Sequence, residues 1–228
     1  YKISREDQDL FAYNSQMKAT KAKETGRLSE EICTVKIPLR KKDDLIFSSD
    51  EFIKPHTSLE KLKTLRPAFR KENGTVTAGT ASPLTDGASA TLVCDEEYAV
   101  SNNLPILARI KSIAINGCPP ELMGLGPIGA SLKALKRAQL NINDIDIVEL
   151  NEAFASQSIA CIKELQINPE IVNIEGGAIA LGHPLGATGT RITAKAAYLM
   201  NKLNKKYALA TQCIGLGQGI ATVLERVS

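Results

Sequence analysis

The sequence has no tryptophan and few other aromatic residues: five phenylalanines and five tyrosines make up 4% of its 228 residues. Proteins that bind single-stranded nucleic acid stack the bases on aromatic rings, so this scarcity argues against such a platform. The net charge at pH 7 is only +3, which gives no separate case for a polyanionic partner. We therefore expect no nucleic acid among its partners.

The sequence also lacks paired cysteine motifs and long apolar runs. Its cysteines are odd in number, widely spaced and never in a Cys-x-x-Cys arrangement: Cys33, Cys94, Cys118, Cys161 and Cys213. This pattern indicates free thiols in a reducing compartment rather than a disulfide framework or a metal site. We expect a cytoplasmic protein, or an organellar matrix protein if the host is eukaryotic. No apolar stretch approaches the length of a membrane span, so no membrane partner is expected.

Two regions of different texture divide the chain near residue 83. Residues 1–82 are charged and predict a helix over 4–23, a strand over 32–39, an irregular stretch over 40–57 and a short helix over 59–65. This region has little predicted core and is typical of a lid or an arm. Residues 83–228 alternate five strands (90–94, 106–115, 146–150, 207–212 and 220–227) with helices (95–103, 128–139, 153–165 and 187–204). Such alternation predicts an α/β domain with a partly parallel sheet.

A glycine-rich stretch over residues 173–191 is the most distinctive part of the sequence. It contains five glycines and His183, one of only two histidines. Glycines let the backbone take positive φ and approach other groups closely, and a loop between a strand and a helix is where α/β proteins carry ligands. A phosphate-binding turn is one reading, although no Gly-Lys-Ser/Thr is present to support a P-loop.

Three loops that follow predicted strands carry Asn151, His183 and Cys213. The loops after parallel strands gather at one edge of a sheet, so these side chains can converge. A thiolate beside a histidine suits acyl transfer, and an amide or a glycine-turn N–H can hold an oxyanion. The competing reading of Cys213 is a small buried core residue. His56 and the cluster at Lys61, Lys63, Arg66, Arg70 and Lys71 are read as solvated surface.

Together these loops resemble the thiolase family. The resemblance lies in Asn-Glu-Ala-Phe from Asn151, in Gly-Gly-Ala-Ile-Ala-Leu-Gly-His-Pro from Gly176 and in Cys-x-Gly-x-Gly-x-Gly from Cys213. It extends to Thr77-Ala-Gly-Thr-Ala-Ser, Asp86-Gly-Ala and Met123-Gly-Leu-Gly-Pro, in family order along the chain. Related ketoacyl synthases have a histidine where this chain has the late cysteine.

The resemblance implies a thiolase-like fold with a mixed five-stranded sheet and helices on both faces. It covers only the later part of the loop (lid) domain, residues 1–82, and the C-terminal α/β domain, residues 83–228. The half that carries the family's acylated cysteine is not represented, and the sequence starts at Tyr1, so a fragment is expected. That N-terminal half is the expected partner, in a homodimer or homotetramer.

The resemblance also implies residue roles in an acyl-CoA acyltransferase. His183 activates the nucleophile, Cys213 moves the α-proton, and Asn151 and the N–H of Gly215 serve two oxyanion holes. Ala81 and Ser82 line the pantetheine channel, and Lys54 contacts the nucleotide. Coenzyme A or acyl-CoA is then a substrate, with no permanently bound cofactor and no metal.

Two residues depart from the family pattern: Glu175 stands where Asn is frequent, and Leu216 stands where Gly is usual. A positive φ at Leu216 would strain the turn by about 1–3 kcal/mol. These departures keep a second reading open, in which the chain is a catalytically inactive relative or a truncated fragment that acts only in binding or assembly.

Overall fold

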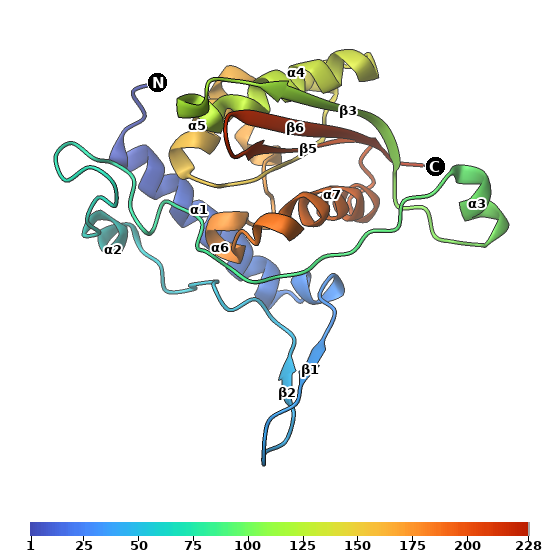
Figure 1. The fold of residues 1–228 in the computed structure, drawn as a ribbon, viewed down its shortest axis with the longest axis horizontal. Helices are drawn as coiled ribbons and strands as arrows, with labels where there is room; N and C mark the ends of the chain where they lie inside the picture. The colour runs from blue at the N-terminus through green and yellow to red at the C-terminus, as the bar shows by residue number, and fades with distance from the viewer. Residues whose placement is uncertain (228) are drawn as a thin grey trace.

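The computed structural model describes residues 1–227 of the chain, and its body is a mixed sheet covered by helices (Figure 1). The described sheet has four strands in the order β3 (Arg109–Gly117), β6 (Gln218–Glu225), β5 (Tyr207–Ile214) and β4 (Ile147–Leu150). Only β4 and β5 run parallel, and the other neighbours are antiparallel. The predicted mixed sheet is therefore confirmed, with one regular strand fewer than expected.

Alternate side chains of the central strands enter two separate cores. Val148 and Leu209 pack beneath α4 (Gly126–Ala138) and α5 (Ala155–Glu164), whereas Ile147 and Ala208 face α7 (Leu185–Lys202). All four of these side chains are at most 1% exposed, and burying an aliphatic side chain of this size contributes about 1.5–3 kcal/mol. The expectation of helices on both faces is confirmed, and these two cores fix the strand ends that carry the site.

The first third of the chain contributes only a small core of its own. Helix α1 (Arg5–Glu24) begins at a capping box, in which Ser4 accepts from the Asp7 backbone and the Asp7 side chain accepts in return. Its small residues Ala12, Ala19 and Ala22 are fully buried against α6 (Ala178–Leu181), α2 (Leu59–Lys63) and neighbouring segments. The buried apolar residues of this region are nevertheless few: Ala12, Ala19, Ala22, Leu28, Ile53 and Leu62. The expectation of little core is therefore confirmed, and the alanines of α1 supply much of it by allowing close helix packing.

Residues 32–47 form a hairpin that projects from the body (Figure 1). Strand β1 (Val35–Ile37) pairs antiparallel with β2 (Leu45–Phe47), so the predicted strand over 32–39 is confirmed only at its centre. The stretch over 40–57, expected to be irregular, contains the second strand. This second strand, β2, has only three apolar residues and follows a charged turn, so it is too short to show the alternation that predicts a strand.

The predicted strand over 90–94 is not formed in the described structure. Leu92 and Val93 are 72% and 67% exposed, and the segment runs past α7 towards α3 (Glu96–Ser101) without pairing (Figure 1). The place of a fifth strand is taken by a single parallel bridge from Val172 to Val148. An apolar, β-branched segment becomes a strand only beside a free edge, and within residues 1–227 no strand lies next to this one.

Short segments complete the described chain. The stretch over 75–82 makes only isolated bridges, from Thr77 to Pro67 and from Ala81 to Phe154. Among residues 1–227 no helix combines the length and the apolar character needed to cross a bilayer. The 3-10 helices are η1 (Leu28–Glu30), η2 (Pro120–Leu125), η3 (Ile142–Asp144) and η4 (Pro169–Ile171).

Candidate functional site

Asn151 and Cys213 emerge at the same edge of the sheet. The backbone N–H of Asn151 donates to the Thr211 carbonyl oxygen at 3.0 Å, which continues the parallel pairing of β4 with β5. Cys213 lies two residues beyond Thr211 on β5. Because the two strands are parallel neighbours, both side chains belong to the carboxyl edge, as the loop positions predicted.

His183 reaches this edge from the glycine-rich stretch. It follows Gly182, whose φ of +98° turns the chain from α6 towards α7. A Cβ at Gly182 would lie 2.5 Å from Oγ1 of Thr85, so no larger residue fits this turn. The His183 ring Nε2 then lies 3.2 Å from the amide nitrogen of Asn151. Two of the predicted site residues are therefore in direct contact.

Thr188 fixes the other side of the imidazole. Its Oγ1 lies 2.7 Å from Nδ1 of His183 and donates to the Pro184 carbonyl oxygen at 3.0 Å. A hydroxyl has a single hydrogen, so at Nδ1 it accepts, and the ring carries its proton there. Nε2 is then the unprotonated nitrogen and accepts from the Asn151 amide.

Burial, and secondarily the charge of Arg191, lowers the pKa of His183. The ring is therefore neutral at pH 7, with its basic nitrogen held at the edge of the sheet. This protonation state suits a general base that takes a proton from a thiol.

Cys213 occupies the end of β5, directly opposite Gly219 of β6. It is 9% exposed, and its burial raises the pKa of the thiol. A thiol that keeps its proton at neutral pH can donate it and later take it back. The start of α7 lies alongside, since a Cβ at Gly189 would be 3.2 Å from Nε2 of Gln212. His183 and Cys213 therefore come to one edge, although they reach it from different elements.

Gly215 begins the three-residue turn between β5 and β6, where its backbone is free of close neighbours on the Cβ side. The next residue, Leu216, has φ +68° and is 87% exposed. Leu216 thus has the positive φ on which the prediction of strain depended. Its side chain is almost fully exposed and makes little packing contact in return.

The predicted binding residues line one cleft of about 640 Å³, a size that suits a small-molecule ligand. Lys54, Ala81 and Ser82 all contribute to it. His56 and Lys61 also line it, and both are exposed to solvent, as the surface reading predicted. The Lys61 ammonium donates to the His56 carbonyl oxygen at 3.2 Å, which holds two of its basic groups together.

The wall of the cleft is joined to the loop that carries Asn151. The Ser82 N–H donates to the Ala153 carbonyl oxygen at 3.1 Å, and the Ala155 N–H donates to the Thr80 carbonyl oxygen at 2.8 Å. Ile179 of α6 lines the same cleft, four residues before His183. The cleft wall is therefore connected to the segments that carry Asn151 and His183, although these two residues do not line it.

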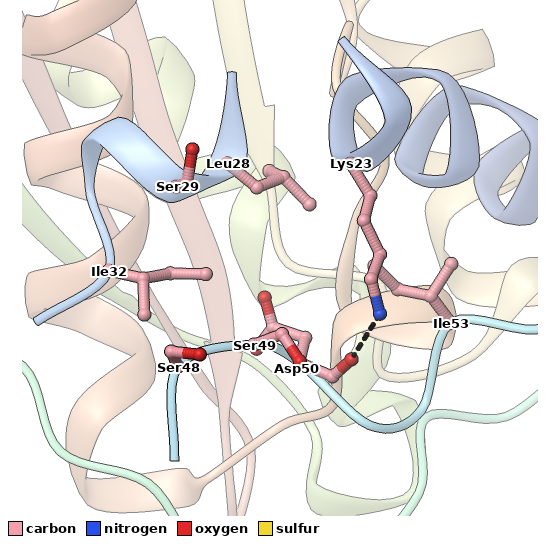
Figure 2. A pocket seen from close by; sticks show the side chains of 8 residues that line it. All are labelled: Lys23, Leu28, Ser29, Ile32, Ser48, Ser49, Asp50 and Ile53. Carbon is pink, nitrogen blue, oxygen red and sulfur yellow. Dashed lines mark hydrogen bonds between the residues drawn. The ribbon is translucent and has the colours of Figure 1, made fainter. Parts of the chain in front are cut away.

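A second cavity lies elsewhere, between residues 48–53 and the end of α1 (Figure 2). Its volume is about 50 Å³, and the Lys23 ammonium crosses it to the Asp50 carbonyl oxygen at 3.3 Å. This space suits a water molecule rather than a substrate. Within residues 1–227, no three His, Cys, Asp or Glu side chains form a group that could hold a metal ion.

The glycine turn itself holds a carboxylate of the chain. Glu152 is buried and accepts from Ser15, from Asn173 and from the Ile179 backbone. A Cβ at Gly177 would lie 2.2 Å from its carboxyl carbon. An internal carboxylate at this place repels a phosphate, so the structure disfavours the phosphate reading of the turn.

Sequence reasoning missed several residues of the site. Thr188 sits in the first turn of a helix, where a threonine ordinarily bonds back to its own backbone. Gln16 of α1 is buried, accepts from the Lys54 N–H at 2.8 Å and donates to the Ile179 carbonyl oxygen at 3.2 Å. Nothing in the local pattern distinguishes it from other helix glutamines. His56 stands two residues after Lys54, and that spacing was the available signal.

These features define an α/β domain with an amide, an imidazole and a thiol at one sheet edge, beside a basic cleft. Two family models match the chain: the thiolase N-terminal domain over residues 1–97 and the thiolase C-terminal domain over residues 104–226. The chain belongs to the thiolase family.

Curated relatives and solved structures agree with this assignment. The chain is 52% identical to a 3-ketoacyl-CoA thiolase of Pseudoalteromonas translucida and 53% identical to one of Vibrio parahaemolyticus. The alignments cover 99% and 98% of this chain but only 59% and 58% of those relatives, so the chain spans under two thirds of their length.

Among solved structures, an acetyl-CoA acetyltransferase of Bacillus anthracis superposes with a TM-score of 0.97 at 40% identity, over 100% of this chain and 57% of that one. A human mitochondrial 3-ketoacyl-CoA thiolase solved in complex with CoA gives a TM-score of 0.90 at 40% identity, over 100% of this chain and 56% of that one. The thiolase-like fold predicted from the sequence is confirmed.

Proposed function

We propose that the protein containing this chain is a coenzyme A-dependent acyltransferase, which cleaves 3-ketoacyl-CoA by thiolysis or condenses two acyl-CoA molecules. The observation that carries the proposal is the contact between Asn151 and His183 at 3.2 Å, at the sheet edge where Cys213 ends β5. The resemblance supplies the reaction class, and the geometry supplies a neutral base, a protonated thiol and an amide donor for it.

Each residue has a defined task in this proposal. Nε2 of His183 takes the proton of the cysteine that becomes acylated, which belongs to the N-terminal half of the family fold. Cys213 gives its proton to the coenzyme A thiolate that leaves on acylation, and as a thiolate it then removes an α-proton from the second acyl-CoA. The resulting carbanion attacks the acyl-enzyme carbonyl and expels the nucleophilic cysteine as a thiolate, which recovers its proton from His183. In the reverse direction Cys213 returns that proton. Donors such as the Gly215 N–H stabilise the oxyanion, and losing one such donor typically costs about 3–4 kcal/mol.

The cleft is proposed to hold coenzyme A. Ala81 and Ser82 form a narrow wall of small residues that suits the pantetheine arm, and Lys54 and Lys61 place positive charge where phosphates would lie. Calorimetry with coenzyme A and with pantetheine tests this. We expect Lys61→Ala to weaken coenzyme A by about two- to fivefold, the range of an exposed ion pair, and to leave pantetheine unchanged. Lys42→Ala, in the exposed turn of the hairpin, is the matched control.

The unpaired segment over 90–94 supports the N-terminal half as a partner. It is apolar, exposed and strand-like in composition, and the N-terminal family model extends over it to residue 97. We propose that it completes a sheet of that half, and that the whole assembles as a homodimer or homotetramer. Five free thiols further suit a reducing compartment such as the cytoplasm.

The chemical test uses the polypeptide together with the acylatable cysteine half. Cys213→Ala should abolish condensation while the acyl-enzyme still forms, as mass spectrometry of the acylated cysteine would record. Turnover at the wild-type rate in that variant would contradict the role of Cys213. The alternative, an inactive relative or a fragment that acts in binding or assembly, predicts coenzyme A binding without any acyl-enzyme.

A further inference from the structure

A buried ion cluster lies under the glycine-rich stretch and is centred on Lys195 of α7. The Lys195 side chain is 1% exposed and pairs with Glu175, whose side chain is 0% exposed. Lys195 Nζ also lies 2.6 Å from Oε1 of Glu31. The other oxygen of Glu175 lies 3.1 Å from Nε of Arg27. Glu175, the least expected residue of the stretch, is thus held from two sides.

The charges in this cluster balance. Burial disfavours the ammonium form of Lys195, but the neighbouring carboxylates of Glu31 and Glu175 oppose it, and the pKa of this lysine is raised. Burial raises the pKa of Glu149, on β4, to about 8, so its carboxyl is neutral at pH 7. Two cations, Lys195 and Arg27, then face two carboxylates, Glu175 and Glu31. Removing one member leaves a buried partner without its counter-charge.

The cluster joins parts of the chain that are far apart in sequence. Arg27 and Glu31 lie just after α1, more than 140 residues before Glu175 and Lys195. Glu175 directly precedes Gly176, which has φ +84° and packs against Ala19 of α1, where an added Cβ would lie 2.6 Å from the alanine Cβ. Beyond this turn only α6 and Gly182 separate Glu175 from His183.

We propose that Glu175 and Lys195 are positioning residues, which hold the segment over 176–183 against the first helix and so place the His183 ring on Asn151. The ion cluster fixes one end of this segment, and the Thr188 hydroxyl fixes the imidazole at the other end. The proposal concerns the geometry of the ring and does not depend on the acyltransferase proposal, because its readout is the imidazole itself.

Nitrogen NMR of the polypeptide labelled with ¹⁵N-histidine provides the test. Only two histidines are present, and the exposed His56 serves as an internal reference. In the wild type we expect His183 to give the signals of one tautomer, with Nδ1 protonated. Lys195→Met and Glu175→Asn should each shift these signals towards the averaged values of His56. The double variant should recover at least half of the shift, because it leaves no unpaired charge at the buried centre.

Lys202→Met is the matched control on the same helix. Lys202 pairs with Glu30 at 2.6 Å, next to Glu31, but the two side chains are 39% and 46% exposed. This variant should leave the His183 signals in place. If a single variant does not fold, Glu175→Gln keeps the shape of the side chain while removing its charge. This variant should shift the His183 nitrogen signals in the same direction by a smaller amount. Unfolding midpoints that fall while the His183 signals stay at their wild-type positions would overturn the proposal.

Discussion

The amide nitrogen of Asn151 lies 3.2 Å from Nε2 of His183, and the hydroxyl of Thr188 lies 2.7 Å from Nδ1 of the same ring. The imidazole is therefore held at both nitrogens by groups from two elements, the end of β4 and the first turn of α7. With the Asn151 amide nitrogen as donor and the threonine hydrogen at Pro184, the ring accepts at Nε2 and carries its proton at Nδ1.

Replacing Thr188 should allow the His183 ring to populate both of its neutral tautomers. In Thr188→Val the Nδ1–H loses its acceptor, and a buried donor without a partner costs about 1–3 kcal/mol of folding free energy. We expect mixed tautomers of His183 in nitrogen NMR and a lower unfolding midpoint, whereas Thr188→Ser should retain the wild-type pattern. Thr193→Val removes a similar bond on the same helix, from Thr193 to the Gly189 carbonyl oxygen at 2.8 Å, without touching the ring. A single wild-type tautomer in Thr188→Val would contradict the assignment.

Glu149 should make stability depend on pH. Burial raises the pKa of Glu149 to about 8 in the folded state, against 4.5 as its ordinary value. The folded state therefore holds a proton that the unfolded state has lost, and this contribution, complete below pH 4.5, decreases as pH rises to about 8. Relative to Glu149→Gln, the wild type should lose up to about 1.4 kcal/mol per pH unit between pH 5 and 8. Parallel profiles from urea unfolding of both proteins would count against a neutral Glu149.

The thiols should react in two classes. Cys33 and Cys94 are exposed, whereas Cys161 and Cys213 are buried, and burial raises the pKa of both buried thiols, that of Cys161 to about 12. Since the thiolate is the reactive form, iodoacetamide at pH 7 should label the exposed pair first and the buried pair far more slowly. Peptide mass spectrometry over time separates the sites. Equal labelling of Cys213 and Cys33 would mean that the β5 end is open to solvent.

Replacing Leu216 by glycine should raise the free energy of unfolding. Its φ of +68° costs about 1–2 kcal/mol, and its side chain is 87% exposed, so little packing is lost on truncation. Leu216→Gly removes the strain but adds about 0.4–1 kcal/mol of unfolded-state freedom, which leaves a net gain of up to about 1.6 kcal/mol. Leu216→Ala keeps the strain and should be neutral. Gly217→Ala, in the same turn, should destabilise, because its Cβ would lie 2.3 Å from the Cys118 carbonyl oxygen.

Sequence reasoning succeeded where a pattern is local and repeated. Helix α4 was predicted over 128–139 and runs over Gly126–Ala138, and strand β5 was predicted over 207–212 and runs over Tyr207–Ile214. The convergence of Asn151 and His183 was predicted from loops taken to follow strands; Asn151 does follow β4, whereas His183 follows helix α6. These elements are determined by burial periodicity and by the geometry of parallel strands.

It failed where the outcome depends on a distant partner. Residues 90–94 have strand composition, yet within residues 1–227 they have no strand beside them. Gln16 and Thr188 act through contacts that no local motif records. The Lys195–Glu175 pair joins positions 20 residues apart, and nothing before the structure indicated that a lysine on an alanine-rich helix face would be buried. The roles assigned to the site residues stay predictions: His183, Cys213, Asn151, Gly215, Ala81, Ser82 and Lys54.

Two main-chain hydrogen bonds join the cleft wall to the loop that carries Asn151. The Ser82 N–H donates to the Ala153 carbonyl oxygen, and the Ala155 N–H donates to the Thr80 carbonyl oxygen. A ligand that contacts Ser82 therefore lies one hydrogen bond away from Ala153, which is two residues beyond Asn151. The cleft wall and the Asn151 loop are thus joined by two main-chain bonds and by a side-chain bond from the Ser82 hydroxyl to the Ala153 carbonyl oxygen at 3.3 Å. Substitution of the Ser82 side chain would leave both main-chain hydrogen bonds between the cleft wall and the Asn151 loop in place.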